Sequence, residues 1–266
     1  MPDHRMRIVV TGAAGRIGRV VAPFLAEQGH EVISTDVVAA PYGIDLPSFR
    51  QADMIDADAM LSVCAGADAV LHLAGKPGNR EWPMLEQVNV TGTRTVFEAA
   101  VAAKVRRIVY ASTNHVCGFN AADVWLDELT PIRPDSPYGV TKMMGELLLS
   151  WLCDAHGISG ASIRIGSFLP EPTELRHLRT WLSPRDMASL ADACLRDCSA
   201  GHRIIWGFSD NQRAPVDHSG WEAIGYWPQD DAEDYITGMG EKSFDPSSAD
   251  PWPHLGGNLA VRVSDA

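Results

Sequence analysis

A glycine-rich segment near the amino terminus constrains the fold of this chain more than any other feature. Residues 12–18 follow the pattern G-x-x-G-x-x-G and come directly after the strand-like run at residues 7–10. Gly12 allows a tight turn, Gly15 lets the backbone approach a pyrophosphate, and Gly18 lets the next helix pack close to the sheet. The free N–H groups and the dipole at the start of that helix favour an anion. The segment therefore predicts a strand-turn-helix unit that binds a dinucleotide.

Short apolar runs alternate with helical stretches along most of the chain. Helices are expected at residues 15–28 and 138–156, because each stretch ends at a glycine suited to a helix C-terminus, Gly29 and Gly157. This alternation is typical of a parallel sheet with helices on both faces. We expect a doubly wound, Rossmann-type α/β fold. Its buried strands are predicted at residues 7–10, 31–34, 69–73, 107–111, 161–165 and 203–206.

The domain organisation follows from the lack of a linker between two cores. The chain has 266 residues, which fits one large α/β domain. We expect residues 1–266 to form a single nucleotide-binding domain, with residues 166–237 as a small substrate-side extension. Residues 238–266 are rich in Gly, Pro, Ser and Asp, so they are expected to form an extended C-terminal arm.

Composition excludes several function classes. The formal net charge of −12 repels nucleic acid and anionic lipid headgroups, and no apolar run is long enough to span a bilayer. The five cysteines include no C-x-x-C pair, so the sequence predicts neither a disulfide framework nor a metal site. We expect a cytoplasmic protein with no nucleic-acid or membrane partner.

The choice of dinucleotide depends on Asp36, which ends the second predicted strand 18 residues after Gly18. A carboxylate at this position binds the ribose hydroxyls of NAD and repels the additional phosphate of NADP. We therefore predict NAD as the cofactor. Asp53 is expected near the adenine, although a solvated surface carboxylate explains it nearly as well. The predicted cofactor-binding residues are Gly12, Gly15, Arg16, Ile17, Gly18, Asp36, Asp53, Met54, Leu73, Ala74, Gly75, Asn89, Tyr138, Lys142 and Ile165.

A second motif supplies candidate catalytic residues. Tyr138 and Lys142 are four residues apart in a predicted helix, so they share one face. The pKa of a free tyrosine is about 10, and a nearby lysine cation favours the phenolate, which makes Tyr138 a candidate general base. Thr113 follows a predicted strand and offers a hydroxyl to a substrate alcohol. A Y-x-x-x-K spacing alone is common in helices, and it is the upstream glycine motif that favours a catalytic role.

These motifs, together with Gly225-Tyr226-Trp227-Pro228, resemble the extended short-chain dehydrogenase/reductases of the NAD-dependent epimerase/dehydratase family. The resemblance covers nearly the whole chain. It implies that Thr113, Tyr138 and Lys142 act together, because in this family the hydroxyl residue usually precedes the tyrosine by 25 positions, as Thr113 does here.

Three further stretches resemble the uronate dehydrogenase branch of this family: residues 111–115, residues 164–167 with 170–172, and Arg176 with residues 180–183. The resemblance implies NAD-dependent oxidation of the anomeric hydroxyl of galacturonate or glucuronate to the aldarolactone. Arg176 would bind the carboxylate with its two-pronged guanidinium. The other predicted substrate-binding residues are Thr113, Asn114, His115 and Ser167. His72 lies within an apolar strand and is expected to be a hydrogen-bonded core histidine.

The loop at residues 76–80 departs from the uronate dehydrogenase pattern, which has a serine where Pro77 stands. Its cations, Lys76 and Arg80, could instead face a phosphate, as in a related branch that oxidises glucose 6-phosphate with NAD. A small-sugar epimerase and a non-catalytic NAD-sensing module are further alternatives. Members of this family commonly pair through two long helices, here residues 89–104 and 138–156, so a homo-oligomer is expected.

Overall fold

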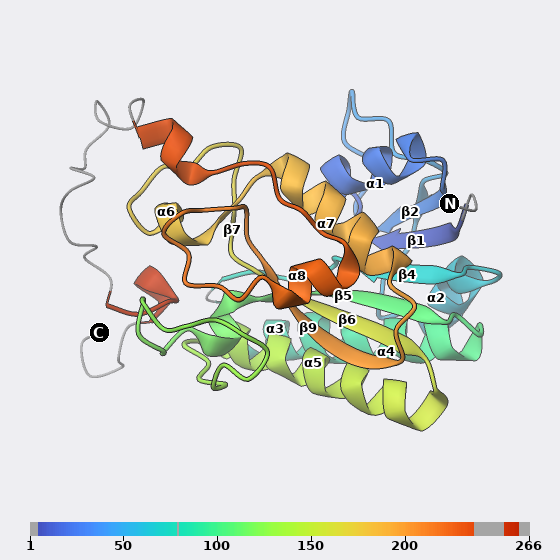
Figure 1. The fold of residues 1–266 in the computed structure, drawn as a ribbon. Helices are drawn as coiled ribbons and strands as arrows, with labels where there is room; N and C mark the ends of the chain where they lie inside the picture. The colour runs from blue at the N-terminus through green and yellow to red at the C-terminus, as the bar shows by residue number, and fades with distance from the viewer. Residues whose placement is uncertain (1–4, 79, 237–252, 261–266) are drawn as a thin grey trace.

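The computed structural model describes residues 5–78, 80–236 and 253–260, and among them a seven-stranded parallel sheet forms the centre (Figure 1). The strand order is β3-β2-β1-β4-β5-β6-β9, so the chain winds outward in both directions from β1 and β4. The fold is therefore the doubly wound sheet that the sequence predicts. The strands are β1 (Arg7–Thr11), β2 (Glu31–Asp36), β3 (Arg50–Gln51), β4 (Ala69–His72), β5 (Arg107–Thr113), β6 (Ser159–Ile165) and β9 (Gly201–Gly207).

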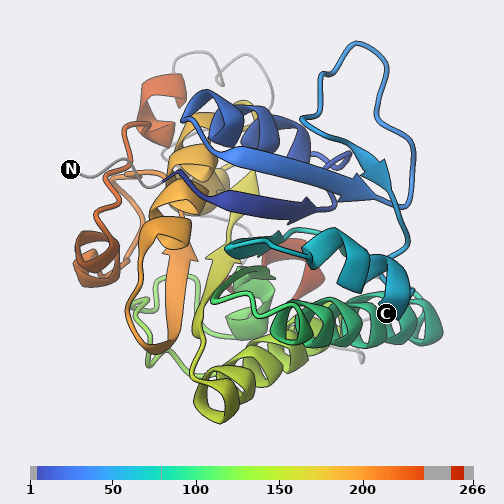
Figure 2. The same ribbon diagram turned by 90° about the vertical axis from the view of Figure 1, so that its right-hand side faces the viewer.

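Helices cover both faces of this sheet, as Figures 1 and 2 show. Successive residues of β1 pack on opposite faces of the sheet. Ile8 and Val10 belong to the core under α1 and α7, and Val9 belongs to the core under α2, α4 and α5. This alternation is why apolar residues stand at consecutive positions in the central strands. The helices of these layers are α1 (Gly18–Glu27), α2 (Ala57–Cys64), α4 (Thr93–Ala102), α5 (Pro137–His156) and α7 (Pro184–Arg196).

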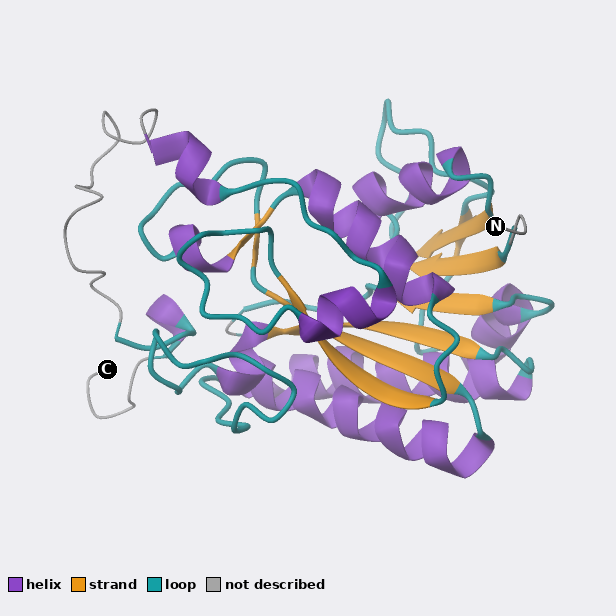
Figure 3. Ribbon diagram, viewed as in Figure 1, coloured by secondary structure: helices purple, strands orange, loops and turns teal. Residues whose placement is uncertain are grey.

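Smaller elements gather at the carboxyl ends of the strands, where loops predominate in Figure 3. Strands β7 (Ser167–Phe168) and β8 (Trp181–Leu182) form a separate two-stranded sheet. The remaining helices are α3 (Trp82–Leu85), the π-helix η1 (Glu86–Gly92), the 3-10 helix η2 (Asn114–Cys117), α6 (His177–Thr180), α8 (Ser219–Ile224), and the 3-10 helices η3 (Ala232–Tyr235) and η4 (Gly257–Leu259). No helix in the described ranges is long and apolar enough to cross a membrane.

Helix α5 has strong local signals at both ends, and these fix the position of its first turn. The side chain of Ser136 accepts a hydrogen bond from the Gly139 N–H, and Pro137 occupies the first turn, where a missing N–H costs nothing. The helix ends at Gly157, whose φ of 65° is left-handed. Tyr138 is therefore held in the first turn, beside the end of β5.

Several predicted boundaries were wrong, including the ends of β5 at Thr113 and of β9 at Gly207. Helix α1 begins at Gly18 and not at residue 15, because residues 12–17 form the turns of the glycine-rich segment. The helix expected at residues 89–104 begins earlier, since η1 precedes α4 without a break and contains Asn89. Strand β4 ends at His72, one residue before the predicted end. Of the predicted C-terminal arm, residues 238–252 and 261–266 lie outside the described residues, and residues 253–260 lie against residues 118–122.

Candidate active site

Two adjoining hollows lie at the carboxyl ends of the strands. The first, of about 470 Å³, contains Tyr138 and is called the catalytic hollow below. The second, of about 480 Å³, contains Asp36 and is called the Asp36 hollow. They meet at Gly12, Gly15, Leu73 and Gly75, which line both. An elongated ligand with two ends fits this arrangement.

The glycine-rich turn at this junction has room only for glycine at two positions. Gly12 has a φ of +69°, and a Cβ added there would lie 2.6 Å from the backbone nitrogen of Ala74. A Cβ on Gly18 would lie 2.4 Å from the carbonyl oxygen of Gly12, which explains the close packing of α1. Gly15, in contrast, is exposed and lines both hollows, so its backbone is open to a ligand. This is the geometry that a dinucleotide pyrophosphate requires.

Asp36 lies at the end of β2 with its carboxylate held by the backbone. One oxygen accepts the Ala14 N–H at 3.1 Å and the other accepts the Val38 N–H at 3.2 Å. A fixed negative charge here suits ribose hydroxyls and disfavours a phosphate. Asp53 and Met54 line the same hollow, and Asp53 is exposed. The residues present therefore fit NAD.

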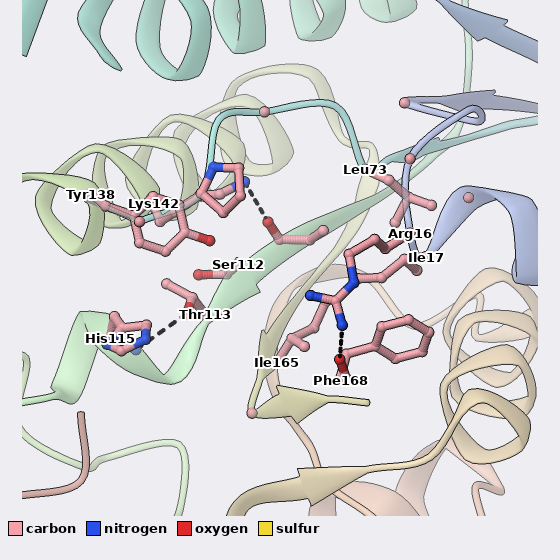
Figure 4. Close-up of a pocket in the computed structure, with 18 of the residues that line it drawn as sticks. Arg16, Ile17, Leu73, Ser112, Thr113, His115, Tyr138, Lys142, Ile165 and Phe168 are labelled. Carbon is pink, nitrogen blue, oxygen red and sulfur yellow. Dashed lines mark hydrogen bonds between the residues drawn. The ribbon is translucent and has the colours of Figure 1, made fainter. Parts of the chain in front are cut away.

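The other predicted cofactor residues mostly lie on the walls of the hollows. Arg16 and Ile17 line the catalytic hollow with Ile165, and the Arg16 guanidinium donates to the Phe168 carbonyl at 3.3 Å across it (Figure 4). Leu73 and Gly75 line both hollows, and Ala74 lines the Asp36 hollow.

Asn89 lies behind these walls and lines neither hollow. Its side chain accepts the Lys76 N–H at 2.8 Å, donates to the Lys76 carbonyl at 3.0 Å, and donates to the Thr141 hydroxyl at 3.1 Å. In this structure Asn89 supports the loop that begins at Lys76, and its predicted contact with the cofactor stays a prediction.

Thr113, Tyr138 and Lys142 come together in the catalytic hollow (Figure 4). Thr113 ends β5, and the other two residues lie on one face of α5. The Lys142 ammonium donates to the Ala111 carbonyl at 2.8 Å and lies 4.7 Å from the centre of the Tyr110 ring. The three residues that the sequence predicts to act together are therefore neighbours in space.

Burial dominates the protonation of the two residues on α5. It raises the pKa of Tyr138 to about 12, although a hydrogen bond with Thr113 acts in the opposite direction. Burial also lowers the pKa of Lys142 to about 8, while the nearby Glu146 carboxylate favours the ammonium. The sequence predicts that Lys142 lowers the pKa of Tyr138. In this structure burial outweighs any such effect, and the ammonium is engaged with the Ala111 carbonyl.

Sequence reasoning missed a buried polar cluster behind these residues. Glu146, one turn after Lys142, accepts the Ser112 hydroxyl at 2.5 Å and binds Arg164 through both carboxylate oxygens, at 3.1 Å and 2.9 Å. Ser112 lies on β5 and Arg164 on β6, so the cluster joins α5 to two strands. The available signals were a glutamate on the buried side of a mostly apolar helix and an arginine inside an apolar strand.

The predicted substrate residues separate into two groups. Thr113 and His115 line the catalytic hollow, and the His115 ring bonds the buried Asp135 carboxylate at 2.7 Å. Ser167 and Arg176 form the other group, joined at 3.4 Å beside Gly166, which lines the hollow. Asn114 is buried and lies off the hollow, with its amide oxygen 3.5 Å from the Thr113 hydroxyl. Asp135 and Leu259, a further lining residue, were not predicted.

Comparison with known proteins identifies the family. The profile described as "NAD dependent epimerase/dehydratase family" matches residues 8–170, which is more than half of the chain. The chain belongs to this NAD-dependent epimerase/dehydratase family. As a member it is an NAD-dependent oxidoreductase, and NAD is the cofactor that its glycine-rich turn and Asp36 fit.

Individual relatives are similar over nearly the full length. Uronate dehydrogenase of Pseudomonas putida is 35% identical over 257 residues, with 96% of each chain covered. The crystal structure of uronate dehydrogenase from Agrobacterium tumefaciens has a TM-score of 0.88 and 34% identity and covers 96% of this chain and 97% of that one; a mutant of it is complexed with NAD. NAD-dependent glucose-6-phosphate dehydrogenase of Haloferax volcanii is 30% identical over 251 residues, covering 86% of this chain and 95% of the relative.

Proposed function

We propose that this protein oxidises the anomeric hydroxyl of a hexuronate, galacturonate or glucuronate, to the aldarolactone with NAD. The observation that carries the proposal is the position of Arg176 next to Ser167, which stands in the chain between Gly166 and Phe168, two residues that line the hollow containing Tyr138. An arginine stays charged at all relevant pH values, and its planar fork matches a carboxylate. The similarity to uronate dehydrogenases points to the same substrate class.

The chemistry is assigned to residues of β5 and α5. The Thr113 hydroxyl holds the substrate hydroxyl, and the Oη of Tyr138 takes its proton. When bound, NAD accepts the hydride and supplies a cationic nicotinamide ring. The residues that would hold it are the glycine-rich turn and Asp36. The Lys142 ammonium, together with the positive charge that NAD would bring, lowers the pKa of the Tyr138 phenol. This effect opposes that of burial and makes proton removal feasible at neutral pH.

One specific observation favours a second candidate, a sugar-phosphate dehydrogenase. The loop that begins at Lys76 contributes Pro77 and Gly78 to the catalytic hollow, and Lys76 itself lines the Asp36 hollow. A cation on this loop suits a phosphate ester. The relative named glucose-6-phosphate dehydrogenase is consistent with this alternative.

A single absorbance assay separates these candidates. We would follow NADH formation with NAD and, in separate reactions, galacturonate, glucuronate, glucose 6-phosphate and glucose. We expect turnover with the uronates, and a KM for uronate about tenfold or more higher in Arg176→Met, because a charge-assisted contact is lost. Lys76→Met is the matched control and should keep that KM. Turnover with glucose 6-phosphate that fails in Lys76→Met would support the second candidate. If no NADH forms with any of the four sugars, an epimerase or an NAD sensor would be favoured.

The remaining expectations form part of the same proposal. Residues 166–237 would supply the substrate side of a single domain, as β7 and Arg176 already suggest by their position. We also propose a cytoplasmic location. The five cysteines are free and four of them are buried, which suits a reducing compartment.

A further inference from the structure

The described part of the C-terminal region, residues 253–260, lies across the loop that follows η2, and is called the C-terminal strap below. It is the short red segment next to the green loop in Figure 1. The Leu255 N–H donates to the Asn120 carbonyl at 3.0 Å, and the Gly256 N–H donates to the Gly118 carbonyl at 3.0 Å. These backbone bonds fix the strap to the loop of its own chain.

The strap also contacts Arg176, whose side chain is mostly buried. The Leu255 carbonyl accepts the Arg176 Nε–H at 3.2 Å. Gly257 packs directly against the same side chain: an added Cβ would lie 2.5 Å from Cδ and 2.7 Å from Nε of Arg176. Because the φ of Gly257 is +61°, a side chain here is strained as well as crowded.

The other end of the strap reaches the catalytic hollow. Leu259 lines that hollow together with Thr113 and Tyr138. In between, Gly256 packs against the Asp135 carboxylate that binds His115, since an added Cβ would lie 1.7 Å from its Oδ2. The strap therefore contacts Arg176 of one group of predicted substrate residues and, at Asp135, the hydrogen-bond partner of His115 in the other.

We propose that the C-terminal strap positions Arg176 for the substrate carboxylate. The inference rests on the proposed function, which assigns a uronate to this hollow. The Leu255 carbonyl holds Nε, and this fixes the plane of the guanidinium; Gly257 leaves the space that the side chain needs. A guanidinium already held in the binding orientation loses less conformational freedom when the carboxylate arrives. Leu255 and Gly257 are thus positioning residues that act through Arg176.

The test is the variant Gly257→Ala, whose Cβ would displace Arg176. We expect a KM for galacturonate about tenfold or more higher, because a displaced guanidinium loses its charge-assisted contacts. The turnover number should stay within about twofold, and the KM for NAD should not change. The matched control is Asn258→Ala, which alters the exposed neighbouring position of the strap and should leave all three constants unchanged.

A double-variant cycle distinguishes positioning from a general structural effect. In an Arg176→Met background, Gly257→Ala should raise the KM no further, since the residue through which it acts is gone. An equal increase in both backgrounds, or an unchanged KM in the single variant, overturns the inference.

If Gly257→Ala does not fold, Gly257→Asn adds the same Cβ with less backbone strain, because asparagine tolerates the left-handed region. If the unaltered protein oxidises no uronate, the proposed function and the inference fail together. If it does and only the KM effect is missing, the inference alone fails.

Discussion

Tyr138 and Lys142 are one helical turn apart, and burial acts on them in opposite ways. It raises the pKa of the phenol to about 12 and lowers the pKa of the ammonium to about 8, so burial opposes the charged form of each. The sequence could predict that the two residues share a face, because that depends on spacing alone. It could not predict the burial, which depends on strands β5 and β6 and on what packs over them. Burial therefore sets the direction of the Tyr138 pKa in this structure, and the expected effect of Lys142 stays a prediction.

Tyr138 is the proposed proton acceptor. Tyr138→Phe removes the phenol and keeps the ring, so the turnover number should fall by roughly 10²–10⁴-fold while NAD binding stays intact. In the unaltered protein the oxidation rate should rise with pH on the acidic side of the profile, because the phenolate is the active form. Steady-state kinetics from pH 6 to 10, with NAD binding measured by calorimetry, would check both points. A Phe variant with near-native turnover would rule out Tyr138 as the base.

Asp36 allows a prediction about cofactor choice. Asp36→Asn keeps the shape of the side chain and removes the charge that repels the NADP phosphate. The ratio of kcat/KM for NADP to that for NAD should rise about tenfold or more, since like charges at close range typically cost more than 1 kcal/mol at a partly buried site. Asp53→Asn, in the same hollow but exposed, is the control and should change the ratio little. Equal effects of the two substitutions would contradict the role of Asp36.

His72 shows which side chains sequence reasoning places correctly. It lies in an apolar strand, and the structure confirms it as a core histidine, bonded to the Thr11 hydroxyl at 2.7 Å and to the Thr93 hydroxyl at 3.1 Å. Burial lowers its pKa to about 3. The burial of a residue could be predicted in this way where the apolar strand that contains it is enough to indicate a core position. Asp135 and Leu259 were not, because their neighbours are distant in sequence.

At the scale of elements, apolar runs located the long strands, and end signals located α5. The two-residue strands β7 and β8 leave no periodic pattern, so the small sheet that carries Ser167 could not be predicted. The π-helix η1 likewise has no signal in a pattern built on 3.6 residues per turn. The glycine-rich turn was predicted, but the start of α1 was placed too early. The last residues of this segment have no sequence signal that separates them from the first turn of a helix.

The Glu146 cluster that joins α5, β5 and β6 supports a prediction at this scale. Glu146→Gln leaves the buried Arg164 without a full counter-charge, and breaking such a pair costs roughly 3–5 kcal/mol of the free energy of unfolding. The Glu146 carboxylate also raises the pKa of Lys142. Without it the Lys142 pKa falls, the ammonium is lost at a lower pH, and the alkaline limb of the activity profile should move to lower pH.

Denaturant unfolding and a pH profile of kcat would measure the two effects separately. The control is Asp154→Asn, which removes an exposed carboxylate from the same helix and should change neither quantity appreciably. A destabilised Glu146→Gln protein with an unmoved pH profile would show that the cluster holds the elements together and does not tune Lys142.

For the molecule as a whole, the topology explains why the site forms where it does. All seven strands of the main sheet are parallel, so their carboxyl ends share one edge, and the chain reverses its winding direction between β1 and β4. Ligands bind at such a switch point. The sequence therefore predicts that the carboxyl ends of these strands share one edge. That expectation brings the glycine-rich turn, Asp36, Thr113 and Tyr138 to the same edge. The contribution of the C-terminal strap could not be predicted, because a chain returning from far away leaves no local pattern.

An apolar stripe on the outer face of α5 bears on the predicted homo-oligomer. Val140, Met144, Leu147 and Trp151 follow helical spacing and are 39%, 43%, 55% and 59% exposed. In Figure 1 this helix forms the outer surface of its layer. Contiguous exposed apolar residues are typical of an interface, and we propose that a second copy of the chain packs here.

The corresponding variant is Leu147→Glu combined with Trp151→Glu, which places two charges on the stripe without entering the core. We expect the unaltered protein to have at least twice the mass of one chain by light scattering, and the double variant to have the mass of one chain. Trp227→Glu is the control, since this side chain is 66% exposed and follows Trp221 and Tyr226, which pack in the core under α1 and α7; it should keep the larger mass. Because Tyr138 and Lys142 lie on the buried side of the same helix, a monomer that folds should keep NAD binding. An unaltered protein that already has the mass of one chain at micromolar concentration would contradict the proposed pairing through α5.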